Sequence, residues 1–202
     1  MKSTLGIERL VADRIRESVA VKQALLQNEE FLALVAEVAR AIVESLCRCG
    51  TVFFFGNGGS AGDAQHLAAE LVGRYLRERR GLAGLALTTN TSCLTAIAND
   101  YGYDSVFARQ LQAMGSAGDI AIGISTSGNS ANVLRAAEAA REKGMITVGM
   151  TGMDGGKLKS LVDYCLCVTA DHTARIQEAH ILIGHILCEI VEEELFDEGR
   201  VS

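Results

Sequence analysis

Five short apolar runs, separated by segments with helical periodicity, constrain the fold of this 202-residue chain more than any other feature. The runs are TVFFF (51–55), LALTT (85–89), DIAIGIS (119–125), MITVGMT (145–151) and YCLCV (164–168). Apolar and polar residues do not alternate within them, which is typical of strands in a parallel sheet that is covered on both faces. The sequence therefore predicts an α/β fold, a three-layer sandwich around a five-stranded parallel sheet.

The segments between the runs predict helices, and two further helices precede the first run. The expected helices are 4–27, 30–48, 60–76, 91–98, a helix ending near 114, 130–143, a short one after 154–157, and 173–196. No linker or repeat divides the chain, so we expect a single domain, 1–202, with a helical pair in 1–48 and an α/β core in 51–196. The helices 30–48 and 173–196 are apolar around much of their circumference, which predicts burial between subunits.

A glycine-rich loop follows the first apolar run and leads directly into a helix. Its sequence, GNGGSA from Gly56 to Ala61, matches the G-x-G-x-x-G/A pattern of dinucleotide-binding proteins. That pattern also requires a carboxylate at the end of the second strand to bind the ribose, and this strand ends in Thr88, Thr89 and Asn90. The loop therefore indicates a phosphate site rather than a nicotinamide site.

A second polar loop, ISTSGNSANV (124–133), follows the third run and opens another helix. Ser125, Thr126, Ser127 and Ser130 place four hydroxyls and several backbone N–H groups around one helix N-terminus. Ordinary N-capping would use one or two of these hydroxyls. The full set favours a phosphate monoester, whose three oxygens accept hydrogen bonds.

Candidate catalytic and metal-binding residues lie on the helix after the glycine loop and on the last helix. His66 and Glu70 are four residues apart, so both can reach one ion or one substrate, although a solvated helical pair has the same spacing. The last helix carries Gln177, Glu178, His180 and His185. Gln177 and His185 are separated by about 12 Å along a regular helix, so spacing alone favours Glu178 as the partner of His185.

The net charge of −6 and the pI of about 5.3 argue against a nucleic-acid partner or an anionic membrane surface. The N-terminal segment has no continuous apolar stretch typical of a signal peptide, and no run approaches the length of a membrane span. We therefore expect a cytoplasmic protein with no membrane or nucleic-acid partner.

Taken in order, the motifs resemble those of the sugar isomerase (SIS) family. They are GNGGS followed by HxxxE, the NDYG loop, GISTSGNSANV, the TGMDGGK turn and ARIQEAH, and they extend from about residue 30 to residue 196. The resemblance implies the flavodoxin-like SIS fold, a homotetramer and one zinc ion per subunit. It also implies isomerisation of sedoheptulose 7-phosphate to D-glycero-D-manno-heptose 7-phosphate through an enediol, the first step toward the heptose of bacterial surface polysaccharide.

The resemblance also implies roles for individual residues. Glu70 and His185 match the acid/base pair, and the matching metal ligands are His66, Glu70, Gln177 and His185. The matching substrate-binding positions are Asn57, Gly58, Gly59, Ser60, Glu70, Asn99, Asp100, Ser125, Thr126, Ser127, Ser130 and Gln177. The separation of Gln177 from His185 leaves two explanations open: His185 serves a neighbouring subunit's site, or Gln177 lies at an irregular helix start.

Two other functions are compatible with the same fold. Some SIS proteins have lost catalysis and act as binding partners, including a DnaA initiator-associating protein in which the positions matching Glu70 and His185 are not Glu and His. This chain keeps both residues, which favours an enzyme. The other alternative is an isomerase for a different sugar phosphate, because the loops that select sugar length cannot be interpreted from one sequence.

Overall fold

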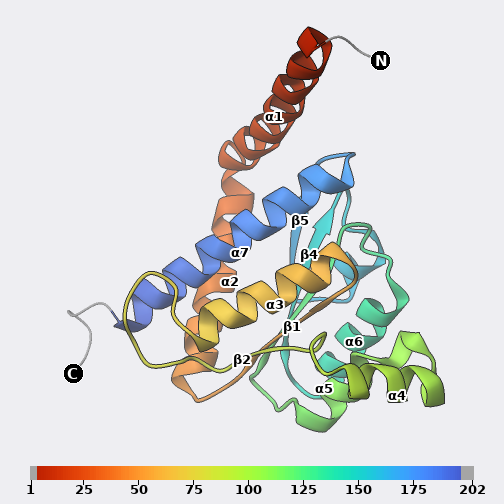
Figure 1. Ribbon diagram of the computed structural model, residues 1–202. Coiled ribbons are helices and arrows are strands. Elements are labelled where there is room, and N and C mark those ends of the chain that lie inside the picture. The colour runs from red at the N-terminus through yellow and green to blue at the C-terminus, as the bar shows by residue number, and fades with distance from the viewer. Residues whose placement is uncertain (1–3, 197–202) are drawn as a thin grey trace.

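The computed structural model describes residues 4–196 and is built around a five-stranded parallel sheet (Figure 1). Its strands are β1 Val52–Gly56, β2 Gly84–Ala86, β3 Ile120–Ser125, β4 Ile146–Gly152 and β5 Tyr164–Val168, in the order β2-β1-β3-β4-β5. The predicted α/β sandwich with a parallel sheet is confirmed. The ends of the predicted 1–202 domain, residues 1–3 and 197–202, lie outside the described residues.

Helices cover both faces of the sheet because successive strand residues point to opposite sides. Phe53 and Phe55 pack on one face, whereas Val52 and Phe54 pack on the other. The first face is covered by α5 (Ala108–Met114) and α6 (Ala131–Glu142), and the second by α2 (Glu29–Cys47), α3 (Gly59–Val72) and α7 (Thr173–Phe196). Each of the larger apolar side chains buried here contributes about 1.5–3 kcal/mol.

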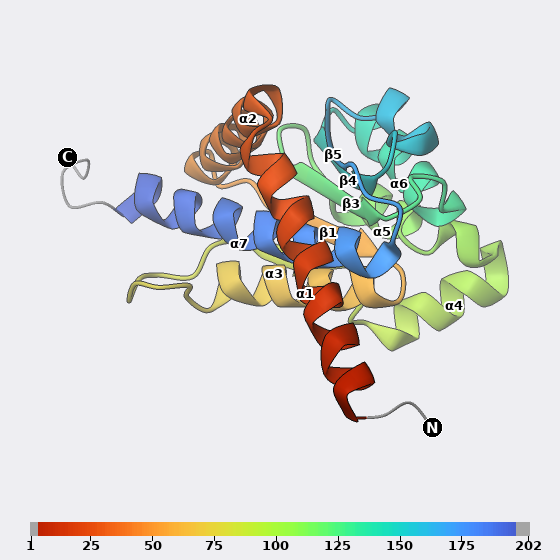
Figure 2. The same cartoon turned by 90° about the horizontal axis from the view of Figure 1, so that it is seen from above.

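Further helical elements complete the described chain. They are α1 (Thr4–Leu26), α4 (Thr91–Tyr101), the short 3-10 helix η1 (Tyr103–Ser105) and the 3-10 helix η2 (Gly156–Ser160). Helix α1 crosses α7 and extends away from the body of the molecule (Figure 2). Part of its apolar surface is therefore exposed in the described chain.

Three predicted boundaries need correction. The helix expected over 60–76 ends at Val72, because a distant carboxylate binds the N–H groups that a longer helix would use. The strand expected over 85–89 is β2, Gly84–Ala86, since Asn90 caps the next helix by accepting from the Cys93 N–H. That helix, expected over 91–98, continues to Tyr101 and stops at Gly102, whose φ is +83°.

The order of the strands places two loops side by side. The chain leaves β1 toward β2 on one side of the sheet and reaches β3 on the other side of β1. Ligands of such sheets bind in the crevice that this reversal creates at the carboxyl ends of the strands. The glycine loop after β1 and the serine-rich loop after β3 therefore meet at this crevice.

Candidate active site

The glycine loop turns the chain tightly from β1 into α3. A Cβ at Gly56 would lie 2.7 Å from the Ile124 carbonyl oxygen and 2.8 Å from the Ser60 Cβ, so a side chain there would separate the strand from its neighbours. Gly58 has φ +56° and precedes the first residue of α3. The N–H groups of Ser60 and Ala61 donate back to the carbonyl oxygens of Asn57 (3.0 Å) and Gly58 (3.1 Å). A glycine-rich turn into a helix N-terminus is a typical site for an anion.

The serine-rich loop places its hydroxyls at the N-terminus of α6. The Ser125 and Ser130 hydroxyl oxygens are 3.0 Å apart, and the Ser127 hydroxyl accepts from the Asn129 N–H. Ser130 is the residue before α6, yet its side chain caps none of the helix N–H groups. The Val133 N–H donates instead to the Ser130 carbonyl oxygen at 3.0 Å. The role of this loop as the phosphate site, and that of Thr126 within it, remains a prediction.

A pair of amide side chains joins the two loops. Asn57 donates to Asn132 Oδ1 at 2.9 Å, and Asn132 donates back to Asn57 Oδ1 at 2.8 Å. The Tyr103 hydroxyl also donates to Asn57 Oδ1, at 3.3 Å. Asn132 and Tyr103 were not among the predicted site residues. Asn132 lies inside the stretch ISTSGNSANV, but nothing local in that stretch indicates a partner 75 residues away.

His66 and Glu70 of α3 meet His185 of α7 in the same chain. The Nε2 atoms of the two histidines are 2.8 Å apart, and His66 Nε2 is 3.3 Å from Glu70 Oε1. One ligand atom from each residue lies within 4.8 Å of the others, so we call this group the metal triad. Two imidazole nitrogens and a carboxylate oxygen are donors typical of a catalytic zinc site with three protein ligands.

Figure 1 shows that α3 and α7 lie side by side, which explains how residues 119 positions apart come together. Gly184 permits this packing, because a Cβ there would lie 2.5 Å from a methyl carbon of Leu67. His185 reaches His66 within the same chain, and α7 is regular from Thr173, so an irregular helix start does not bring Gln177 to His185. A site shared with a neighbouring subunit stays a prediction.

Gln177 lies at the other end of the same crevice. A Cβ on Gly59 would come within 2.6 Å of the Gln177 amide nitrogen, so this side chain contacts the start of α3. Its predicted role as a metal ligand is not tested by this contact. Glu178, the alternative that spacing favoured, is engaged elsewhere, because its carboxylate pairs with Arg175 at 2.5 Å.

The charges around the metal triad affect Asp63, one turn before His66 in α3. Burial raises the pKa of the Asp63 carboxyl above its usual value, and the nearby His66 and His185 oppose that shift. One of its carboxylate oxygens is buried without a partner among the described residues. Asp63 is therefore a partly buried carboxyl close to both histidines of the metal triad.

Asn99 and Asp100 do not lie in a loop as predicted. Both belong to the last turn of α4, where the Asn99 amide donates to the Asp100 carboxylate at 2.8 Å. The helix reaches this far because Gly102 is the first residue able to end it. Their contact with substrate stays a prediction, and it is Tyr103 of the following turn that hydrogen bonds to the glycine loop.

Residues 16–152 of this chain match the family model of the SIS domain. The chain therefore belongs to the SIS domain family, as its fold and its strand-end loops indicate. It is 53% identical to the phosphoheptose isomerase of Aneurinibacillus thermoaerophilus over 192 residues, which cover 95% of this chain and 97% of that protein. The phosphoheptose isomerase of Sulfurimonas denitrificans is 51% identical over 96% of this chain and 99% of its own length.

A solved structure gives the same result in three dimensions. The phosphoheptose isomerase of Neisseria gonorrhoeae superposes with a TM-score of 0.87 at 44% sequence identity, over 93% of this chain and 99% of that one.

Proposed function

We propose that this chain, acting as a single SIS domain, is an aldose–ketose isomerase that converts sedoheptulose 7-phosphate to D-glycero-D-manno-heptose 7-phosphate. The observation that carries the proposal is the metal triad in a chain about half identical to proteins named phosphoheptose isomerase. The reaction is the entry to heptose biosynthesis. The chain keeps Glu70 and His185, which favours this activity over a purely binding role.

The two halves of the crevice have different tasks in this proposal. The loop 125–130 and the start of α3 bind the phosphate, which fixes the sugar by the end that does not react. Asn57 and Gln177 contact hydroxyls between the phosphate and the metal triad. The binding energy of the unreactive end thereby positions C1 and C2 beside Glu70 and His185.

Isomerisation removes a proton from C1 and returns a proton to C2, while the hydroxyl proton on O1 leaves and O2 gains one. A carboxylate and an imidazole on neighbouring helices can exchange these protons as general base and general acid. Glu70 and His185 fit these roles, because their reacting atoms belong to one group within 4.8 Å. His66 holds the arrangement together from the centre of that group.

The residues of the metal triad fit one zinc ion per subunit, with Gln177 as an added ligand in the proposed full set. When bound, zinc supplies a positive charge that stabilises the enediolate oxygens. In the described residues no helix is long and apolar enough to cross a bilayer. We place the reaction in the cytoplasm, since a sugar phosphate is strongly charged and does not cross membranes unaided.

The test is to incubate the purified protein with sedoheptulose 7-phosphate and to measure the aldoheptose product. Glu70→Gln should abolish turnover and leave the circular dichroism spectrum unchanged, because the substitution removes only a proton-transfer group and a charge. Glu138→Gln, an exposed change on α6, is the matched control and should keep wild-type activity. A chelator should remove the activity and added Zn²⁺ should restore it; an active Glu70→Gln enzyme would refute the mechanism.

A further inference from the structure

A buried ion pair lies just beyond the metal triad. Arg79 Nε is 2.6 Å from Glu192 Oε2, and the two side chains are only 1% and 2% exposed. Arg79 belongs to the segment 73–80 after α3, and Glu192 belongs to α7. A buried pair with both partners present has its charges compensated, but the loss of either partner leaves an unpaired buried charge.

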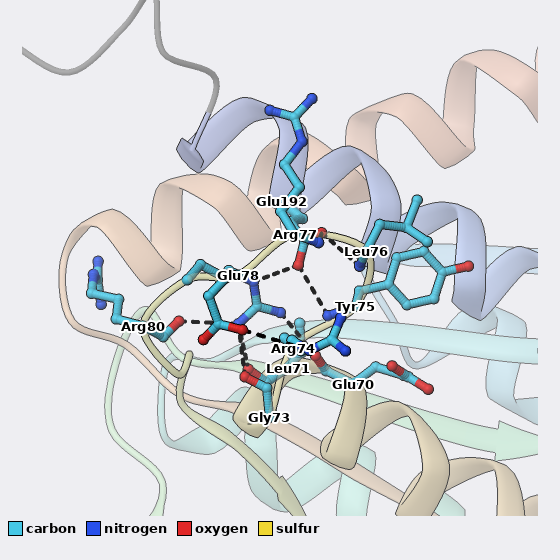
Figure 3. A network of polar contacts seen from close by, with 11 residues as sticks. Glu70, Leu71, Gly73, Arg74, Tyr75, Leu76, Arg77, Glu78, Arg80 and Glu192 are labelled. Carbon is cyan, nitrogen blue, oxygen red and sulfur yellow. Dashed lines mark hydrogen bonds and ion pairs between the residues drawn. The ribbon is translucent and has the colours of Figure 1, made fainter.

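The Glu192 carboxylate organises the segment that follows α3. It accepts hydrogen bonds from three successive backbone N–H groups, those of Tyr75 (3.0 Å), Leu76 (2.7 Å) and Arg77 (2.6 Å). Figure 3 shows these residues converging on the Glu192 side chain. A carboxylate from a distant helix thus takes the place of the carbonyl groups that would have continued α3.

The Arg79 guanidinium binds the C-terminal end of α3. It donates to the carbonyl oxygen of Glu70 at 2.8 Å and to that of Leu71 at 3.0 Å. These carbonyls are among the last four of α3, which have no partner within the helix. A cation at this position also interacts favourably with the helix dipole. The backbone of Glu70 is therefore fixed by Arg79.

The same ion pair reaches His185 through Tyr75. The Tyr75 ring lies against the His185 ring, with centroids 5.8 Å apart and the planes inclined by 34°. The backbone of Tyr75 is held by Glu192, which stands seven residues after His185 and so on nearly the same side of α7. The buried pair therefore makes two contacts near the metal triad. Arg79 binds the backbone of Glu70, and Glu192 binds the backbone of Tyr75, whose ring lies against His185.

We propose that Arg79 and Glu192 are positioning residues for the metal triad, holding Glu70 and His185 at the separation that binds a divalent cation. The proposal rests on the proposed function only in taking the triad as a zinc site. Neither residue touches the triad's ligand atoms directly. They act through the Glu70 backbone and the Tyr75 ring.

The experiment measures Zn²⁺ affinity of the full-length protein by competition with a chromophoric chelator, alongside circular dichroism and thermal unfolding. Glu192→Gln keeps the shape of the side chain and removes its charge. We expect it to weaken Zn²⁺ binding by about 10- to 100-fold, as other changes behind metal ligands do. A Glu192→Gln protein that is folded and binds Zn²⁺ as tightly as wild type would overturn the proposal.

The matched control is Asp119→Asn. The Asp119 carboxylate is also buried and accepts from two backbone N–H groups, those of Thr51 and Ser116, but it lies at the opposite ends of the strands. The Asp119→Asn substitution should lower the unfolding temperature of the protein without changing its Zn²⁺ affinity. An equal loss of Zn²⁺ affinity in Asp119→Asn would show that the effect of Glu192 is general destabilisation, and would overturn the proposal.

If Glu192→Gln does not fold, Arg79→Lys carries the same test, because lysine keeps the charge but cannot span Glu192 and the two α3 carbonyls together. Wild-type Zn²⁺ affinity in that variant would overturn the proposal.

The isomerase assay distinguishes failure of the positioning proposal from failure of the proposed function. A wild-type protein that isomerises nothing refutes the proposed function, whereas the contrast between Glu192→Gln and Asp119→Asn still decides the positioning role. A wild-type protein that binds no Zn²⁺ refutes both.

Discussion

His180 is a fully buried histidine in α7 that takes no part in the metal triad. Its Nε2 donates to the Thr151 carbonyl oxygen at 3.0 Å, while its Nδ1 has no partner among the described residues. Burial lowers the pKa of this imidazole, and the hydrogen bond to Thr151 opposes the shift only in part. The folded protein therefore keeps His180 neutral at pH values where the unfolded chain binds a proton.

This difference gives a pH dependence of stability. Because the pKa is lower in the folded state, the free energy of unfolding should fall as pH drops below about 6.5, the usual histidine pKa, by up to about 1.4 kcal/mol per pH unit. His180→Gln should flatten that slope, since glutamine does not titrate. Urea unfolding at several pH values between 8 and 5 measures how the free energy of unfolding changes with pH. The same pH dependence in the wild type and in His180→Gln would contradict the prediction.

The two loops at the carboxyl ends of β3 and β4 pack together through glycines. Gly128 has φ +62°, and a Cβ there would lie 2.0 Å from the carbonyl oxygen of Gly155, a backbone atom that cannot move alone. The serine-rich loop thus has its shape only while residue 128 lacks a side chain. The metal triad lies on α3 and α7 and does not depend on this contact.

Gly128→Ala should therefore displace the loop and raise the KM for sedoheptulose 7-phosphate by about tenfold or more, which corresponds to about 1.4 kcal/mol of lost binding. Zn²⁺ affinity should not change. Gly118→Ala is the control, because Gly118 also has positive φ, +87°, but a Cβ there meets nothing within 4 Å. Steady-state kinetics of both variants measure this effect. A KM for Gly128→Ala equal to that for Gly118→Ala would show that the loop tolerates the clash.

The arrangement of the whole molecule leaves α1 without a partner along much of its length. Several of its apolar side chains are strongly exposed at helical spacing, namely Ile7, Leu10, Val11, Ile15 and Val19. A stripe of this kind is typical of a helix that packs against another surface. The homotetramer that the resemblance to the SIS family implies would supply that surface from a second copy.

Replacing Val11 and Ile15 together by Glu should dissociate the assembly, because each subunit would then bury charges in the interface. Sedimentation velocity would show a smaller species than wild type. Arg9→Glu changes the charge on the opposite side of the same helix and should leave the assembly intact. An unchanged sedimentation coefficient in the double variant would place the subunit contact elsewhere.

The sequence predicted the elements and their order well, because the signals for them are local. The apolar runs, the glycine at the end of β1 and the four-residue spacing of His66 and Glu70 can each be interpreted within a window of a few residues. Helix α7 was predicted with its observed bounds, Thr173–Phe196. The resemblance to the SIS family added Gln177, whereas spacing alone favoured Glu178 as the partner of His185.

What required the tertiary structure is the pairing of segments far apart in the chain. Only the packing of α7 on α3 brings His185 to His66, and only the order of the strands brings Asn132 to Asn57. The early end of α3 at Val72 has the same origin, since the carboxylate responsible belongs to Glu192, more than 110 residues later. Periodicity and turn chemistry act within a few residues, so the sequence by itself determined the elements, whereas contacts that depend on the fit of whole helices against a sheet were decided only by the folded molecule.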